Sequence, residues 1–329
     1  MRFGWLGALT VAAMLALSLP FSGCGLIGEA GPTPTPTPTP TRTPTPTATA
    51  TPTPTSTPTS TATPTPVPAV ETASLQVRQG GAVALRVLAS AGSAAATFAG
   101  RGYPMLPYES GFWTVIGVTA DQPPGTYPVS IDVFDAAGAP LGILSASLTV
   151  LDTEYPVEDI YLAPEQSALL DPALVQQEQN TRAAVFAAFT PQKLWTGPFI
   201  FPMSAPISSP YGIGRSYNGG PVSSYHTGTD FLADEAAPVM ACATGTVAFL
   251  GALPVRGNSV ILDHGAGVFS AYHHLAQMTV ALGQSVTAGD LVGTVGSTGL
   301  ATGPHLHWEV IVMGVNVDPV LWTYEDLAP

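Results

Sequence analysis

The chain has 329 residues, of which nine are Lys or Arg and 22 are Asp or Glu, so its formal net charge is −13. Because nucleic-acid binding depends on clustered cationic side chains, this balance argues against a nucleic-acid partner. Only two cysteines occur, Cys24 and Cys242, which excludes a disulfide framework.

Residues 1–23 have the pattern of an export signal peptide. An apolar run over residues 5–19 follows Arg2 and is too short for a stable membrane-spanning helix. The run ends at Phe21-Ser22-Gly23-Cys24, which resembles the lipobox of bacterial lipoproteins. That resemblance implies that Cys24 is acylated and that residues 24–31 form a lipid-anchor region at the bacterial membrane or envelope. A plain export signal or an uncleaved anchor is the alternative, and every interpretation predicts an extracytoplasmic location.

Residues 32–68 contain 13 prolines alternating with 17 threonines. Such a segment has almost nothing apolar to bury, and each proline removes a backbone donor. We therefore expect a disordered Thr/Pro-rich linker. In polyproline II geometry, at about 3.1 Å per residue, it would reach on the order of 110 Å.

Residues 69–151 are expected to form a small antiparallel, Ig-like β-sandwich. Apolar residues alternate with others in short runs, as at Val83, Leu85 and Val87, and turn signals such as Pro123-Pro124-Gly125 separate the runs. Histidine is absent from this module and its acidic residues are scattered. We interpret it as a spacer or a binding module.

Residues 152–194 are expected to be a connecting segment that contains a helix. Asp171-Pro172 offers an N-cap followed by proline at the first helical position, and the apolar spacing continues to Thr190-Pro191. We expect this helix to pack against a neighbour. From Trp195 to the end, short runs rich in Val, Thr and Gly predict an all-β domain over residues 195–329.

All six histidines lie between His226 and His307. They form groups, because Asp230 follows His226 by four residues and His305 precedes His307 by two. Residues two or four apart share a face of an extended strand, so each pair is expected to project together.

Two imidazoles and one carboxylate from separated segments suit Zn²⁺ and leave a fourth position for water, so we predict His226, Asp230 and His307 as metal ligands. Zinc favours amide hydrolysis because it lowers the pKa of a bound water and polarises a carbonyl. His305 would take a proton from the water, while His274 would stabilise the oxyanion or protonate the leaving amine. Activity should therefore fall in acid, as His274 or His305 gains a proton and the ligands lose metal.

Three motifs in one domain carry a family resemblance: His226-x-x-x-Asp230, Tyr272-x-His274-Leu275 and Gly303-Pro-His305-Leu-His307-Trp-Glu. They resemble the lysostaphin/LytM-type zinc metalloendopeptidases, which cut peptidoglycan peptides. The resemblance covers residues 199–319, including the glycine-spaced stretch from Gly283 to Gly303.

This resemblance implies a duplicated hybrid motif fold, with two antiparallel sheets and a groove that takes an extended peptidoglycan stem or cross-bridge peptide. It implies a role in cell-wall remodelling with zinc as cofactor. The family's metal ligands fall on His226, Asp230 and His307, and its catalytic histidines fall on His274 and His305, in agreement with the chemical assignment.

The other polar residues of this region have their own predictions. His273 should face away from its neighbour on a strand and be structural, and His264 is expected at a turn or supporting the site. Cys242 lies in an apolar strand and should be buried. Glu309 shares a face with His307 and either orients an imidazole or lies at an exposed strand end.

Groove walls that select the scissile bond are expected from the loops at residues 218–225 and 252–258. Tyr211, Tyr217 and Tyr225 either line the groove or pack in the core. The sequence leaves these alternatives open.

Three alternatives to a peptidase have different requirements. A biotinyl or lipoyl carrier needs a lysine at a hairpin tip, but the only lysine, Lys193, precedes the domain. A catalytically inactive groove protein that activates another cell-wall hydrolase would have lost metal ligands, and here all are present. A lipid-anchored adhesion protein with a residual zinc site is the third alternative.

Overall fold

The computed structural model describes residues 34–37, 68–72 and 74–329. The predicted export signal, Cys24 and most of the Thr/Pro-rich segment lie outside these residues. Within the described ranges, no helix combines the length and the apolar character needed to cross a membrane. The folded residues belong to one compact unit, which extends to Pro329.

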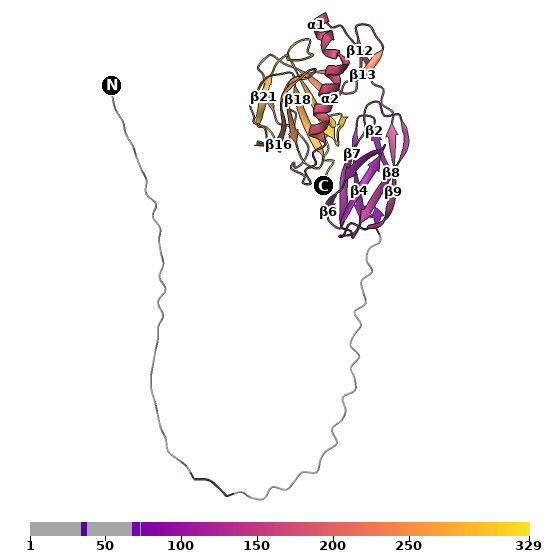
Figure 1. The fold of residues 1–329 in the computed structure, drawn as a ribbon, viewed down its shortest axis with the longest axis vertical. Coiled ribbons are helices and arrows are strands. Elements are labelled where there is room, and N and C mark those ends of the chain that lie inside the picture. Colours follow the sequence, from indigo (N-terminus) through magenta and orange to yellow (C-terminus); the bar gives the residue numbers. More distant parts are fainter. Residues whose placement is uncertain (1–33, 38–67, 73) are drawn as a thin grey trace, which may run out of the picture. The chain divides into compact units, whose positions relative to one another are not determined.

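The first module consists of two β-sheets (Figure 1), and their buried apolar side chains form one core. The four-stranded sheet has the order β1-β3-β7-β6, and the five-stranded sheet has the order β2-β9-β8-β4-β5. Their bounds are β1 (Ala69–Val70), β2 (Ser74–Arg78), β3 (Ala82–Leu88), β4 (Ser93–Phe98), β5 (Arg101–Pro104), β6 (Leu106–Tyr108), β7 (Gly111–Gly117), β8 (Gly125–Phe134) and β9 (Pro140–Leu151). The mainly β prediction is confirmed, whereas the Ig-like topology stays a prediction.

Period-two alternation forms this core. On β8, Val129, Ile131 and Val133 are buried, and the residues between them are partly exposed. One pairing differs from the antiparallel expectation, because β2 and β9 run parallel.

The connecting segment contains β10 (Val157–Ile160), α1 (Pro164–Ser167), a 3₁₀ turn (Ala168–Leu170) and α2 (Pro172–Phe186). The predicted N-cap of α2 is confirmed, because the Asp171 carboxylate accepts a hydrogen bond from the Ala173 amide. The helix ends at Phe186, four residues before Thr190. β10 pairs in parallel with a strand of the C-terminal domain, so this segment is part of that domain's sheet structure.

The C-terminal domain is built from short strands in three sheets, one more than the two predicted, because β10 of the connecting segment joins β12 and β13 in a sheet of their own. The largest, eight-stranded sheet has the order β11-β14-β22-β18-β17-β16-β20, with β23 paired to β22. The three-stranded sheets have the orders β15-β21-β19 and β10-β12-β13. Their bounds are β11 (Ile207–Ser209), β12 (Gly214–Tyr217), β13 (Val222–Tyr225), β14 (Thr229–Leu232), β15 (Pro238–Met240), β16 (Gly245–Leu253), β17 (Gly257–Asp263), β18 (Val268–His273), β19 (Leu275–Met278), β20 (Ser285–Val286), β21 (Leu291–Val295), β22 (His305–Val312) and β23 (Val315–Val317).

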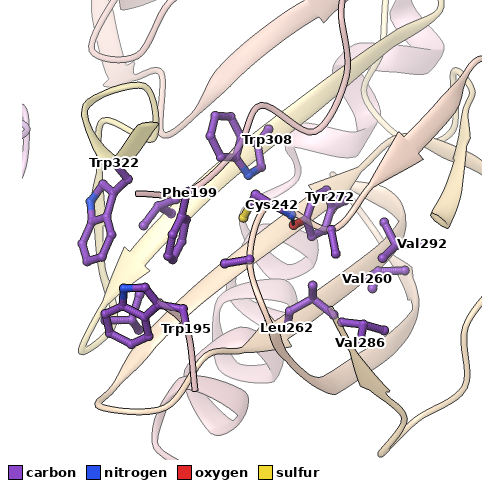
Figure 2. Packing of buried hydrophobic residues seen from close by; sticks show 14 of the residues in the cluster. Trp195, Phe199, Cys242, Val260, Leu262, Tyr272, Val286, Val292, Trp308 and Trp322 are labelled. Carbon is purple, nitrogen blue, oxygen red and sulfur yellow. Dashed lines mark hydrogen bonds between the residues drawn. The ribbon is translucent and has the colours of Figure 1, made fainter. Parts of the chain in front are cut away.

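Aromatic side chains from distant segments close the core of this domain (Figure 2). The ring centroids of Phe199 and Trp322 lie 5.1 Å apart, and those of Trp195 and Phe199 lie 5.9 Å apart. Cys242 is fully buried, as predicted, and its amide donates a 2.7 Å hydrogen bond to the Tyr272 hydroxyl. The first segment of the domain, with Trp195 and Phe199, and its last segment, with Trp322, therefore pack together in the core.

His264 is a structural residue of this core. Its imidazole is fully buried, with Nδ1 2.8 Å from the Thr244 carbonyl oxygen and Nε2 2.8 Å from the Ser270 hydroxyl. It lies at the turn after β17, as expected, and these partners are core groups. Burial lowers its pKa from 6.5 to about 4.

Acid should destabilise the domain through His264. Because the unfolded imidazole binds a proton near pH 6.5 and the folded one only near pH 4, the contribution is complete above pH 6.5 and is lost as the pH falls to 4, by about 3 kcal/mol. The free energy of unfolding, measured in guanidinium chloride with a chelator at pH 7 and pH 4, should fall less in His264→Gln than in the wild type. Equal losses in both proteins would contradict this assignment.

Candidate functional site

Adjacent strands bring the three predicted ligands together. β14 and β22 are antiparallel neighbours whose register places Asp230 directly opposite His307, while His226 lies in the short connection that precedes β14. Asp230 Oδ1 is 2.7 Å from His307 Nδ1 and 3.0 Å from His226 Nε2, and the two ring nitrogens are 3.0 Å apart. Three candidate ligand atoms thus converge on one point, where they can hold a metal ion.

The remaining ring nitrogens of both histidines have acceptors of their own. His226 Nδ1 is 2.9 Å from the Pro210 carbonyl oxygen, and His307 Nε2 is 3.0 Å from Glu309 Oε1. Hydrogen bonds of this kind fix the tautomer of a metal-binding imidazole, so His226 Nε2 and His307 Nδ1 turn lone pairs toward Asp230. Lone pairs facing one another at 3.0 Å need a cation between them. The donor set therefore fits a divalent metal ion.

The charges around His307 point the same way. Burial lowers the pKa of His307, but the hydrogen bonds and charges of Asp230 and Glu309 outweigh burial, so that its pKa is raised. Burial raises the pKa of Asp230, but its hydrogen bonds with His226 and His307 hold it well below its usual range. The site therefore favours positive charge, which either a proton or a metal ion supplies.

Arg215 supports the outer oxygen of the Asp230 carboxylate. Its Nη2 lies 3.4 Å from Asp230 Oδ2 and 3.0 Å from the Ser209 hydroxyl, while its Nη1 lies 2.7 Å from Glu158 Oε2 on β10. This contact leaves Oδ1 as the oxygen that faces the two imidazoles.

The two predicted catalytic histidines lie beside this group. The ring centroids of His274 and His305 are 4.7 Å apart, and those of His274 and His307 are 6.0 Å apart. His274 Nδ1 is 2.7 Å from the Thr298 carbonyl oxygen, and His305 Nδ1 is 2.8 Å from the Gly303 carbonyl oxygen. Because carbonyl oxygens only accept hydrogen bonds, both Nδ1 atoms carry the proton, and both Nε2 atoms are free to accept one.

The prediction that His273 faces away from its neighbour is wrong. His274 has a φ of 60°, in the left-handed region, so the alternation of β18 stops there. His273 stacks on His307 at 5.6 Å, its Nδ1 lies 2.8 Å from the Ser259 hydroxyl and its Nε2 lies 3.5 Å from Glu309 Oε2. His273 is buried and structural, as predicted, but it supports the ligand side of the site.

Glu309 is fully buried, so the exposed alternative is wrong and the orienting one is confirmed. Its Oε1 also receives hydrogen bonds from Thr227, at 2.7 Å, and from Arg256 Nη2, at 2.8 Å, while Oε2 pairs with Arg182. Burial raises the pKa of Glu309, but the two guanidinium groups outweigh it and hold the pKa well below the usual range.

Sequence reasoning missed the residues that hold Glu309. Arg182 and Glu178 lie on α2, where Glu and Arg four residues apart are typical of a solvent-exposed pair. The sequence signal for a different role was the gap in the apolar spacing of α2 between Val175 and Val185. In the structure, the two buried residues of α2, Glu178 and Arg182, lie in this gap. Arg256 lies in a predicted groove loop and had no motif of its own.

A cavity of about 1190 Å³ opens onto all five predicted site residues. Tyr217 and Tyr225 line it, as do residues of both loops predicted to form groove walls. Tyr211 instead packs in the core, where its hydroxyl donates a 2.9 Å hydrogen bond to the Asn316 carbonyl oxygen. The connecting segment adds a wall that the sequence did not predict, including Ile160 and Val175.

Comparisons with known proteins agree with this geometry. The model of Peptidase family M23 matches residues 224–319, a shorter range than the predicted resemblance over 199–319. The DD-carboxypeptidase/endopeptidase Mpg of Neisseria meningitidis serogroup B is 42% identical over 117 residues, which are 35% of this chain and 26% of that protein. The peptidoglycan DD-endopeptidase ShyA of Vibrio cholerae is 42% identical over 93 residues, 28% of this chain and 22% of that protein.

A solved structure extends the likeness beyond the matched domain. The crystal structure of a putative peptidase M23 from Pseudomonas aeruginosa has a TM-score of 0.57 and 27% identity, and the alignment covers 75% of this chain and 95% of that chain. The curated relatives are matched over only about a quarter of their own length. The family resemblance of the histidine motifs is confirmed for residues 224–319, the part of this chain that matches the model of Peptidase family M23.

Proposed function

We propose that this protein is a zinc-dependent endopeptidase that hydrolyses amide bonds in peptidoglycan stem or cross-bridge peptides during cell-wall remodelling. The convergence of His226, Asp230 and His307 on one point carries this proposal. Two imidazole nitrogens and one carboxylate oxygen are the donors of many catalytic zinc sites, whereas calcium and magnesium require more oxygen ligands. Mpg and ShyA, whose names include endopeptidase activity, support this class of reaction.

The chain's own residues perform distinct tasks in this proposal. His226, Asp230 and His307 hold the metal, which when bound acts as a Lewis acid on the substrate carbonyl and on water. His305, with its Nδ1 proton held by the Gly303 carbonyl, accepts a proton at Nε2 from the attacking water. His274, held in the same way by Thr298, is the second proton-transfer group: its Nε2 takes up the proton that the attacking water has lost and passes it to the leaving amine.

The cavity supports a peptide substrate. Its volume, about 1190 Å³, exceeds that of sites for small ligands, and its lining combines polar groups with Ile160, Leu162, Tyr217 and Tyr225. An extended peptide can pack on these side chains while its amide groups form hydrogen bonds with the polar ones.

Removing the metal or a ligand should abolish hydrolysis. The full chain incubated with purified sacculi should release muropeptides, identified by mass spectrometry, whose ends name the bond that is cut. A chelator, His307→Ala or Asp230→Ala should reduce release at least about 100-fold, because even the outer contacts of a metal site are worth about 10- to 100-fold. Zinc should restore the chelated wild type.

Asp234→Ala is the matched control, since this carboxylate is exposed and four residues from Asp230. It should retain zinc and activity. Release that persists in the chelated protein would refute the proposal. Intact sacculi with about one zinc per chain would also refute it and would favour the adhesion protein with a residual zinc site, because a groove protein that activates another hydrolase is expected to hold no zinc.

The acid limb of the pH profile of activity, that is, the fall in rate at low pH, should arise from protonation of the metal ligands. Burial and the neighbouring histidines lower the pKa of His274 to about 3, so we expect it to stay neutral between pH 5 and 8, which leaves the loss of metal from the ligands as the expected cause of the lower activity in acid. His307, whose pKa is raised, binds protons in competition with the metal as the pH falls.

Accordingly, His274→Asn should lower kcat/KM on a cross-linked muropeptide by about 100-fold or more without moving the acid limb. Bound zinc, measured across the same pH range, should fall together with the wild-type rate. A shift of the limb in this variant would assign the limb to His274.

We also propose that Cys24 is lipidated and anchors the protein on the extracytoplasmic side of the bacterial membrane, with the Thr/Pro-rich segment as a tether. The lipobox-like sequence before Cys24 supports this proposal. In cells, the wild type should fractionate with membranes and incorporate labelled palmitate. Cys24→Ser should do neither, whereas Cys242→Ser, which alters a buried core cysteine, should behave as the wild type. Equal labelling of the two variants would contradict the anchor.

A further inference from the structure

Helix α2 buries charge in the place where a packed helix normally buries apolar side chains. Its two buried residues are Glu178 and Arg182, one turn apart. Burying charged groups is unfavourable unless each finds close partners. The position of these two side chains therefore requires an explanation beyond packing, which Val185 and Phe186 already provide against the large sheet.

Both charges are paired with residues of the C-terminal domain. Arg182 binds Glu309, and Glu178 Oε1 lies 2.7 Å from Arg256 Nη1. Glu178 Oε2 also accepts hydrogen bonds from the amides of Val255, at 2.6 Å, and Arg256, at 3.1 Å. Two carboxylates and two guanidinium groups thus form a neutral four-residue network that is buried except at Arg256, whose side chain is 18% exposed.

The network ends at a metal ligand. Arg256 Nη2 and Nε lie 2.8 and 3.1 Å from Glu309 Oε1, the oxygen that is 3.0 Å from His307 Nε2. Glu309 can hold the His307 ring in one orientation only while its own two oxygens are fixed. Arg182 fixes one of them, and Arg256, held by Glu178, fixes the other.

We propose that Glu178 and Arg182 are positioning residues of the metal site, which act through Glu309 to make His307 present Nδ1 to the metal. Both lie upstream of residues 224–319, the part matched by the family model. This inference rests on the proposed function, because it assumes that zinc binds at His226, Asp230 and His307. According to this inference, α2 contributes to metal binding although it carries no metal ligand.

Zinc affinity tests the proposal directly. The full chain is stripped of metal, and its zinc Kd is measured by competition with a chromogenic chelator. Arg182→Met and Glu178→Gln should each weaken zinc binding, Arg182→Met by about 10-fold, the lower end of the range for outer contacts of metal sites. Gln177→Ala, an exposed neighbour on the same helix, should bind zinc as the wild type does. Activity lost in the two network variants should return in part at saturating zinc.

A double-mutant cycle separates positioning from packing. If Arg182 acts through Glu309, Arg182→Met should change the zinc Kd less than about 2-fold in a Glu309→Gln background, because the contact is already broken. The thermal unfolding midpoint of each metal-free protein shows that it is folded. Should Arg182→Met fail to fold, the same cycle is run with Glu178→Gln.

Each result decides the question. A lowered unfolding midpoint with an unchanged zinc Kd would show that α2 only packs, and equal losses in both backgrounds would show that Arg182 does not act through Glu309. Either result overturns the inference and leaves the proposed function intact. A wild type that binds no zinc would overturn the proposed function first.

Discussion

One imidazole between two carboxylates, of which Glu309 is fully buried, is the interaction on which the site depends. His307 lies 2.7 Å from Asp230 through Nδ1 and 3.0 Å from Glu309 through Nε2. Both carboxylates favour positive charge at this ring, and both must stay ionised to do so. Arg215 supports the first carboxylate, while Arg182 and Arg256 support the second. The three arginines thus have one effect in common: they fix the two carboxylates, which hold the His307 ring so that the Nδ1 lone pair faces a cation.

The sequence predicted the parts of this arrangement that depend on strand periodicity. Alternation predicted that His305 and His307 share a face of one strand, whereas Asp230 was assigned to the same site from the zinc donor set and the family resemblance; the strands of Asp230 and His307 are in fact paired. The same period-two pattern predicted the mainly β architecture, and the Asp171-Pro172 signal predicted the start of α2. In each case a local rule, strand alternation or helix capping, determines the structure, and such rules can be applied to the sequence without knowing which segments meet in space.

The rest depends on partners that are distant in sequence. The positive φ of His274 ends the alternation of β18, so His274 does not point opposite to His273 as predicted. Glu178 and Arg182 have the spacing of an exposed ion pair, and only the position of Glu309 and Arg256, over 70 residues later, makes them buried. Charged residues carry no periodic signal for burial, because burial is tolerated only where a specific partner is present.

These contacts also bear on where the functional unit begins. A boundary at residue 195 follows the change in composition, and the family match begins later still, at residue 224. Yet Glu158 on β10 holds the arginine beside Asp230, and α2 holds the glutamate beside His307. A fragment that starts at residue 195 would remove Glu158 from Arg215 and Arg182 from Glu309, and one that starts at residue 224 would lack Arg215 as well. The unit that holds the candidate metal ligands in this arrangement therefore includes the connecting segment, and we place its start by these ion pairs rather than by composition.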